Sequence, residues 1–113
     1  MALLGHQQLF LLDVAKLIVK AKELGYVATA GELWRPQAMQ DIYLKEGKTH
    51  AKFSNHTERL AIDLNLFKDN VLCTAEEIRP LGHFWESLSN MNRWGGNFTT
   101  IKDGPHFERN IRS

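Results

Sequence analysis

The chain has 113 residues, of which 43% are hydrophobic and 24% charged, values typical of one folded domain with its own core. Its 14 basic and 13 acidic side chains give a formal net charge of +1, which argues against the broad positive surface of a nucleic-acid-binding protein. Cys73 is the single cysteine, so an internal disulfide is excluded and a buried, inert thiol is expected.

The N-terminal segment favours a protein that is made in the cytoplasm and does not insert into a membrane. No basic region precedes the apolar run at residues 9–12, and Asp13 interrupts this run, so it fits neither a signal peptide nor a membrane span. Apolar side chains among lysines predict an amphipathic helix from about residue 7 to residue 24, ended by Gly25. The apolar positions on which this prediction depends are Leu9, Leu12, Leu17, Val19 and Leu24.

The next part of the chain predicts a strand, a helix and a polar loop. Residues 26–30 are extended, and Pro36 suits the first turn of a helix that ends near Gly47, which places Arg35 at a strand-to-helix junction. Residues 47–55 are polar and are expected to form a loop, where functional side chains are commonly displayed. His50 and Ser54 lie in this loop and are candidate substrate contacts, with a plain loop position as the alternative for each.

Residues 60–67 alternate between apolar and other side chains, which predicts a strand. Its apolar face carries Leu60, Ile62, Leu64 and Leu66. Asp63 points away from that face. Seven residues of straight strand would separate His56 from Asp63 by about 23 Å, and seven of helix by about 10 Å, whereas the atoms that bind one metal ion lie a few ångströms apart. If His56 and Asp63 share an ion, residues 57–59 must bend back.

The sequence Thr-Ala-Glu-Glu at residues 74–77 has the form of a capping box, in which the first and last side chains bond each other's backbone N–H groups. It predicts a helix that continues to Leu88 and places Trp85 in the core. Pro80 and Gly82 weaken the middle of this predicted helix.

Two short strands are predicted near the C-terminus. Residues 90–97 are turn-like, residues 98–101 are expected to form a strand, Asp103-Gly104 a tight turn, and residues 106–109 a final strand. Residues 1–113 are therefore expected to form one α+β domain, in which helices pack on a small, mostly antiparallel sheet.

Two short motifs contain residue types that bind metal ions. The segment Ser-Asn-His-Thr-Glu-Arg-Leu-Ala-Ile-Asp at residues 54–63 includes His56 and Asp63, and Asp103-Gly-Pro-His106 adds a second histidine. Catalytic zinc takes three protein ligands from His, Asp or Glu and leaves a fourth position for water. His56, Asp63 and His106 could supply such a set, with Asp103 as a spare acid. From spacing alone, structural or surface roles for these four residues are the alternative.

The spacing Ser-x-His-x-x-x-x-Ala-x-Asp, followed by Trp94-Gly-Gly-Asn-Phe98 and then by Asp-x-x-His-Phe-Glu, resembles small zinc peptidases that cleave bacterial peptidoglycan. These include D-alanyl-D-alanine peptidases of the vancomycin-resistance type and phage endolysins that cut the L-alanyl-D-glutamate bond. The resemblance covers residues 26–108, most of the chain. It implies a single peptidase domain of the D,D-peptidase/hedgehog-like fold, here without a separate cell-wall-binding domain.

By this resemblance, His56, Asp63 and His106 are zinc ligands and Asp103 is the catalytic acid/base. Arg35 matches an upstream arginine that helps to hold the substrate, so it is counted with the catalytic and the substrate-binding residues. Peptidases that act on D-alanyl-D-alanine usually have Glu where this chain has Asp103, whereas the L-alanyl-D-glutamate endolysins have Asp. An ordinary Asp-Gly turn and a solvated helix start are the alternative readings of Asp103 and Arg35.

Three further positions have open interpretations. The family usually has Gly where this chain has Arg59; a Gly there suggests a positive φ angle, so the shape of this loop is in question. Trp94, with two glycines after it, could let the backbone approach the substrate, or could serve in packing. Glu108 follows His106 by two residues on the same strand face and could orient that ligand, with a surface salt bridge as the alternative.

The resemblance implies a zinc-dependent peptidoglycan peptidase that hydrolyses the stem peptide with a metal-activated water, most similar to an L-alanyl-D-glutamate endopeptidase of the phage endolysin type. The alternatives are a D-alanyl-D-alanine carboxypeptidase and a non-catalytic wall-binding or virion module of the same fold. Asp103 argues against the last, because a binding module has no need of a spare acid. We expect a monomer that reaches the wall during lysis, through a holin-type pore or as part of a virion.

Overall fold

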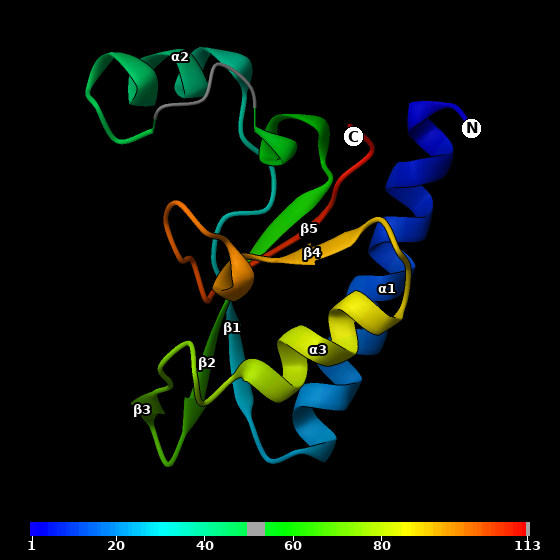
Figure 1. Ribbon diagram of the computed structural model, residues 1–113, viewed down its shortest axis with the longest axis vertical. Helices are drawn as coiled ribbons and strands as arrows, with labels where there is room; N and C mark the ends of the chain where they lie inside the picture. The colour runs from blue at the N-terminus through cyan, green and yellow to red at the C-terminus, as the bar shows by residue number, and fades with distance from the viewer. Residues whose placement is uncertain (50–53, 113) are drawn as a thin grey trace.

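The computed structural model describes residues 1–49 and 54–112 (Figure 1). Its elements, in chain order, are α1 (Leu3–Glu23), β1 (Val27–Ala30), α2 (Gln37–Lys45), the 3-10 helix η1 (Asn55–Glu58), β2 (Ala61–Lys68), β3 (Val71–Leu72), α3 (Arg79–Ser87), β4 (Asn92–Trp94), the 3-10 helix η2 (Gly95–Asn97) and β5 (His106–Arg109). The strands form one antiparallel sheet in the order β1-β2-β5-β4, with β3 paired to β2. The predicted α+β class with a small antiparallel sheet is confirmed.

Helices α1 and α3 pack against each other and against the sheet, whereas α2 lies apart from both, at the upper left of Figure 1. Trp85 of α3 is completely buried between Phe10 of α1 and Phe107 of β5, with ring centroids 5.7 and 6.0 Å away in edge-to-face geometry. Its indole N–H donates to the backbone carbonyls of Arg93 (3.1 Å) and Glu108 (3.0 Å). Trp85 therefore connects the helical core directly to the backbones of β4 and β5.

Helix α1 is present but buries a different face from the one predicted. Of the five apolar positions used for the prediction, only Leu17 is buried, while Leu9, Leu12, Val19 and Leu24 are 38–60% exposed. The buried side is formed by Phe10, Val14, Leu17 and Ala21, which follow the spacing of one helical face. The helix carries apolar residues on both sides, so hydrophobicity alone did not identify the core-facing side.

No helix within residues 1–49 and 54–112 has the length and apolar character needed to cross a membrane.

Strand β2 and the turn before it follow the prediction closely. Its apolar face is at most 6% exposed. Between His56 and Asp63 the chain bends back through η1, and Arg59 closes this turn with φ 58° and ψ 37°. This left-handed conformation is the one that the glycine of the resembling peptidases suggests, and here an arginine adopts it. The Arg59 guanidinium lies 4.6 Å from the centre of the Trp34 ring.

The capping box at Thr74 and Glu77 forms, but it closes a turn rather than the first turn of the helix. The N–H of Thr74 donates to Glu77 Oε1 (2.9 Å), and the N–H of Glu77 donates to Thr74 Oγ1 (3.3 Å). Helix α3 begins at Arg79, so Pro80 lies in its first turn, where a missing N–H leaves no helical bond unmade. The predicted weakness at Pro80 is therefore wrong.

The strand predicted at residues 98–101 is wrong. β5 pairs with β2 on one side, and the strand on its other side is β4, which lies inside the segment that was expected to be turn-like. Asn92 of β4 is buried, and its amide donates to the Trp85 carbonyl (3.0 Å) and to Asp13 Oδ2 (3.1 Å). The segment forms a strand because partners distant in the sequence bond its polar side chain, which no local pattern reveals.

Arg59 provides a test of backbone strain. We expect the Arg59→Gly variant to be about 1 kcal/mol more stable than Arg59→Ala, because both lose the contact with Trp34 and only glycine adopts a left-handed conformation without strain. Chemical denaturation of the two variants measures the difference. Equal stabilities would show that the turn after η1 does not strain a residue with a side chain.

Candidate metal centre

The pairing of β2 with β5 brings one residue from each motif to the same face of the sheet. Asp63 lies directly opposite His106, and such cross-strand neighbours have Cβ atoms about 4.5–5.5 Å apart. His106 Nδ1 is 3.3 Å from Asp63 Oδ1. The backbone of Asp63 is held on its other side, because its N–H donates to the Glu32 carbonyl (2.8 Å) and its carbonyl accepts from Gly31 (2.8 Å).

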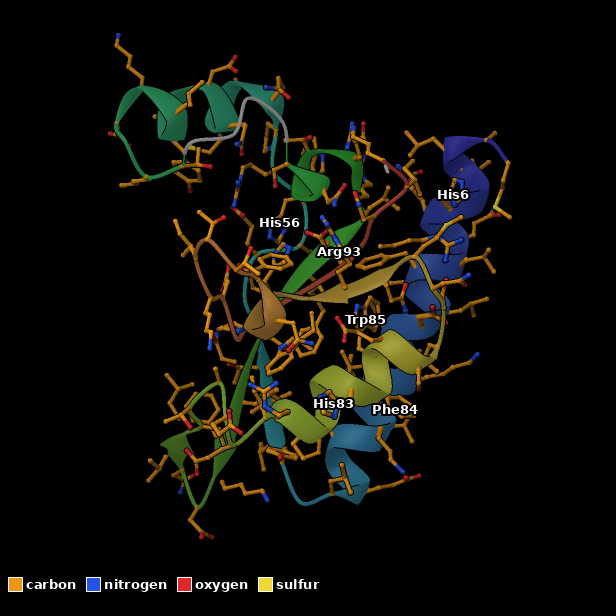
Figure 2. The ribbon with its side chains drawn as sticks, in the orientation of Figure 1. His6, His56, His83, Phe84, Trp85 and Arg93 are labelled. Atoms are coloured by element: carbon orange, nitrogen blue, oxygen red, sulfur yellow. The ribbon has the colours of Figure 1, made fainter. Side chains whose placement is uncertain are left out.

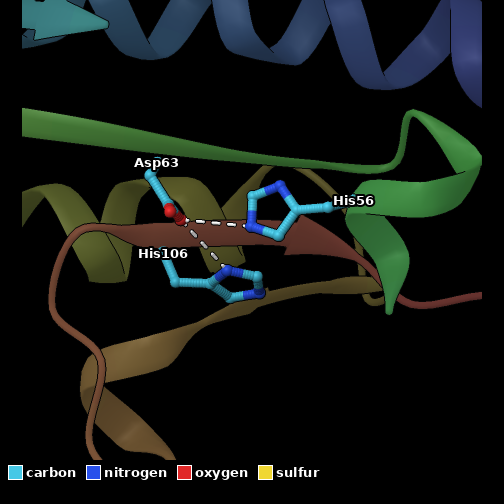
Figure 3. A group of neighbouring side chains, drawn as sticks. All are labelled: His56, Asp63 and His106. Carbon is cyan, nitrogen blue, oxygen red and sulfur yellow. Dashed lines mark hydrogen bonds and ion pairs between the residues drawn. The ribbon is translucent and has the colours of Figure 1, made fainter. Parts of the chain in front are cut away.

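The turn η1 adds the third side chain, as the sequence requires if residues 57–59 bend back. His56 Nε2 lies 3.3 Å from the same Asp63 Oδ1, and both imidazoles face the carboxylate (Figure 3). One possible ligand atom from each of the three residues lies within 4.8 Å of the other two. Both histidines are buried. In the described part of the chain, this is the one group of His, Cys, Asp or Glu side chains with such a geometry.

Hydrogen bonds behind each imidazole determine which nitrogen has a free lone pair. His56 Nδ1 is 3.2 Å from the Leu33 carbonyl oxygen, which can only accept, so Nδ1 carries the proton and Nε2 is free. His106 Nε2 is 2.7 Å from Glu108 Oε1, so in the neutral ring Nε2 carries the proton and the lone pair is on Nδ1. Two imidazole lone pairs and one carboxylate oxygen therefore converge, and this donor set fits a zinc ion.

The electrostatics of the cluster favour positive charge between the three side chains. Burial acts to lower the pKa of His106, but its hydrogen bonds with Asp63 and Glu108, together with their charges, raise it to about 9. Burial acts to raise the pKa of Asp63, yet the hydrogen bonds with His106 and His56 hold it well below its usual value. Asp63 therefore remains ionised at neutral pH, as a metal-binding carboxylate must.

Asp103 lines the same cavity as the three clustered side chains. The volume of this cavity is about 310 Å³. The predicted turn is present, because the N–H of His106 donates to the Asp103 carbonyl (3.1 Å). Partial loss of hydration raises the pKa of the Asp103 carboxyl, the charge of His106 lowers it, and the charge of Asp63 raises it again. The net shift is upward, which is the direction that suits a carboxylate that accepts and returns a proton.

Arg35 also lines this cavity, in the loop between β1 and α2 where the sequence places it. Its Nε donates to Glu32 Oε1 (2.8 Å), Nη2 donates to the same oxygen, and Nη1 donates to Gln40 Oε1 (2.5 Å). Its guanidinium carbon lies 4.9 Å from the centre of the Tyr43 ring. The side chain is therefore held in one orientation at the cavity wall.

Ser54 borders the cavity and caps η1, since its hydroxyl accepts from the N–H of His56 (3.2 Å). It thereby holds the turn that carries a predicted ligand. His50 lies outside the described residues. Tyr43 and Lys48 line the cavity as well, and the sequence analysis missed both. Lys48 falls in the polar loop that the sequence marks as functional, whereas no local signal marks Tyr43.

The substrate contact predicted for Trp94 is wrong, because Trp94 has no exposed surface. Its indole N–H donates to the Gly104 carbonyl (2.8 Å), and a Cβ at Gly82 or Gly96 would lie 2.2 Å from the ring. The indole fills the space beneath the turn that contains Asp103. Trp94 therefore has the packing role that was the alternative.

A family model described as D-alanyl-D-alanine carboxypeptidase matches residues 47–109, more than half of the chain and both motifs. The chain belongs to this peptidase family. No curated protein matches it. Among solved structures, the Serratia marcescens L-Ala D-Glu endopeptidase ChiX is similar, with a TM-score of 0.70 and 22% identity over 88% of this chain and 79% of that one. At this identity the likeness shows a shared fold, and with the family match it confirms the resemblance stated from the sequence.

The ligand assignment predicts that the protein binds about one zinc ion and that alanine at His56, Asp63 or His106 abolishes binding, because each change removes one of three protein ligands. His83→Ala is the control, since His83 is exposed on α3 and lies away from the cluster (Figure 2). Metal analysis of dialysed samples measures occupancy. Full occupancy in all three cluster variants would refute the assignment.

A chelator should also lower the melting temperature of the parent protein, since zinc stabilises the native state that binds it.

Proposed function

We propose that this peptidase is a zinc-dependent peptidoglycan endopeptidase that cleaves the stem peptide between L-alanine and D-glutamate. The supporting observation is that two further pockets adjoin the central cavity. The central cavity shares His106 with a polar pocket of about 310 Å³ that Arg93 also lines, and shares Asp103 with a pocket of about 590 Å³ that Phe98 also lines. An endopeptidase needs room for the substrate on both sides of the scissile bond, whereas an enzyme that removes a terminal residue needs little room on one side.

Two further observations favour the L-alanyl-D-glutamate bond. The acid before His106 is Asp103 rather than Glu, as in the endolysins that the sequence resembles. The ChiX structure, which shares this fold, is described as an L-Ala D-Glu endopeptidase. A D-glutamyl residue also brings a carboxylate, and Arg35 and Lys48 supply positive charge along the cavity.

The residues of the cavity have complementary roles in this proposal. When bound by His56, Asp63 and His106, zinc supplies Lewis-acid activation of water and of the peptide carbonyl. Asp103 accepts a proton from the attacking water at its carboxylate and delivers it to the departing amine. Arg35 binds a substrate carboxylate through the N–H groups that Glu32 and Gln40 leave open.

Removal of a terminal D-alanine is the second candidate reaction, and the description of the matching family favours it. A non-catalytic wall-binding module is the third possibility. The products of the reaction distinguish all three. An endopeptidase releases the peptide that begins at D-glutamate, a carboxypeptidase releases single D-alanine residues, and a binding module releases neither.

Digestion of purified peptidoglycan tests the proposal. We expect zinc-loaded protein to yield muropeptides that end at L-alanine, together with free peptides that begin at D-glutamate, and we expect no products after chelation. Mass spectrometry of the soluble and insoluble fractions identifies them. Loss of a single alanine as the only product would replace the proposed activity with carboxypeptidase activity.

Asp103→Asn tests the proton-transfer role. The amide is nearly isosteric and leaves the three proposed ligands in place, so zinc content and peptide affinity should match those of the parent. The hydrolysis rate should fall by roughly a hundredfold or more, the usual effect of losing general acid/base assistance. Asp41→Asn, an exposed change on α2, is the matched control and should keep the full rate. A folded, zinc-loaded Asp103→Asn protein that hydrolyses at the parent rate would remove Asp103 from the mechanism.

A further inference from the structure

Glu108 is a buried carboxylate directly behind the cluster. It lies two residues after His106 in β5, so both side chains point to the same face of the sheet, and its own side chain is only 6% exposed. Its Oε1 lies 2.7 Å from His106 Nε2. Its Oε2 accepts from Arg93 Nη2 (2.7 Å), Arg93 Nε (3.0 Å) and Asn55 Nδ2 (2.9 Å). Both carboxylate oxygens are therefore bonded to donors.

The bond to His106 determines which imidazole nitrogen can face a cation. A carboxylate offers no proton, so the hydrogen in the contact between Glu108 Oε1 and His106 Nε2 comes from the imidazole. With the proton on Nε2, the lone pair of the neutral ring is on Nδ1, the nitrogen 3.3 Å from Asp63. Glu108 thereby selects the tautomer of His106 that can act as a ligand.

The bond to Asn55 connects the two elements that carry the histidines. Asn55 is the first residue of η1 and immediately precedes His56, while Glu108 shares β5 with His106. Arg93 holds the same Glu108 oxygen from β4. One carboxylate therefore joins η1, β4 and β5 just behind the cluster. Figure 2 labels His56 and Arg93, which lie near each other in this part of the molecule.

We propose that Glu108 is a positioning residue for the metal centre: it holds His106 as the Nε2–H tautomer and, through Asn55, keeps η1 where both imidazoles meet Asp63. This inference rests on the proposed zinc site, because it concerns the geometry of one of its ligands. It assigns Glu108 no contact with substrate and no proton transfer.

Glu108→Gln is the informative variant, because the side chain keeps its size while one of its two acceptor oxygens becomes a donor NH₂ group. If the amide oxygen faces His106, the amide NH₂ meets the donors of Arg93 and Asn55. If the NH₂ faces His106, it favours a proton on Nδ1, where the metal must bind. In either orientation zinc affinity should fall by about tenfold to a hundredfold, the usual effect of losing the partner of a ligating histidine.

Zinc titration with a competing chelator measures this affinity. Glu86→Gln is the matched control, because Glu86 also bonds two donors, the N–H of Trp94 (3.1 Å) and Asn97 Nδ2 (2.9 Å), but lines none of the three pockets at the site. It should bind zinc as the parent does. Nitrogen-15 NMR of labelled histidine adds a readout that general destabilisation would not change: the Nε2–H signal of His106 should be present in the zinc-loaded parent and shifted or lost in Glu108→Gln.

The outcomes separate this inference from the proposed function. A parent protein that binds no zinc would refute the metal centre itself. A parent that binds zinc, with a Glu108→Gln variant of equal affinity and an unchanged His106 signal, would overturn the role of Glu108 alone. If Glu108→Gln does not fold, Asn55→Ala decides, because it keeps the bond between Glu108 and His106 and removes one of the three bonds to Oε2, together with the bond from Arg112 Nη1 to Asn55 Oδ1 (3.3 Å). Its affinity should fall about fivefold, the effect of one hydrogen bond, and parental affinity would overturn the proposal.

Discussion

The pairing of β2 with β5 is the constraint on which the rest of the molecule depends. Asp63 stands opposite His106 on one face of this pair, while Ile62 and Phe107, the neighbouring pair, point into the core. Side chains alternate along a strand, so a slip of one residue in either strand would turn that strand's metal-binding candidate into the core and its apolar neighbour, Ile62 or Phe107, out of it. The burial of the core and the geometry of the site are thus fixed by the same register.

The supports of the site extend from this pairing into the core. Trp85 donates to the backbone carbonyls of Arg93 and Glu108, and the side chains of these two residues form the ion pair behind His106. The candidate ligands lie on two strands and a short capped turn, whereas Asp103 lies in a loop at the rim. This division is suitable for a hydrolase, because the metal needs a fixed geometry while loops can shape the substrate groove.

Features determined by neighbouring residues could be predicted from the sequence. The alternation in β2 and the Asp103-Gly-Pro-His106 turn follow from local spacing, and the bend between His56 and Asp63 follows once both are assigned to one ion; all three appear in the structure. The family resemblance brought the four residues of both motifs together before the fold was known. It also identified the position of Arg59 as one where a positive φ angle was expected.

Features determined by distant partners could not be predicted. Strand β4 depends on bonds from Asn92 to Trp85 and Asp13, and the burial of Trp94 depends on Gly82 and Gly96, which leave space for its ring. The buried side of α1 was missed because that helix is apolar on both sides. The bond between Glu108 and Asn55 was also hidden, since the two residues lie 53 positions apart in the chain.

X-ray absorption spectroscopy of the zinc-loaded protein tests the central claim most directly, because it identifies the atoms bound to the metal without reference to activity. The account predicts a first shell of nitrogen and oxygen at about 2.0–2.2 Å, with the outer-shell scattering of two imidazoles. A His106→Ala sample, which should bind no zinc, should give no such spectrum. A sulfur atom at about 2.3 Å, or a spectrum without imidazole, would show that zinc binds elsewhere and would contradict the assignment of His56, Asp63 and His106.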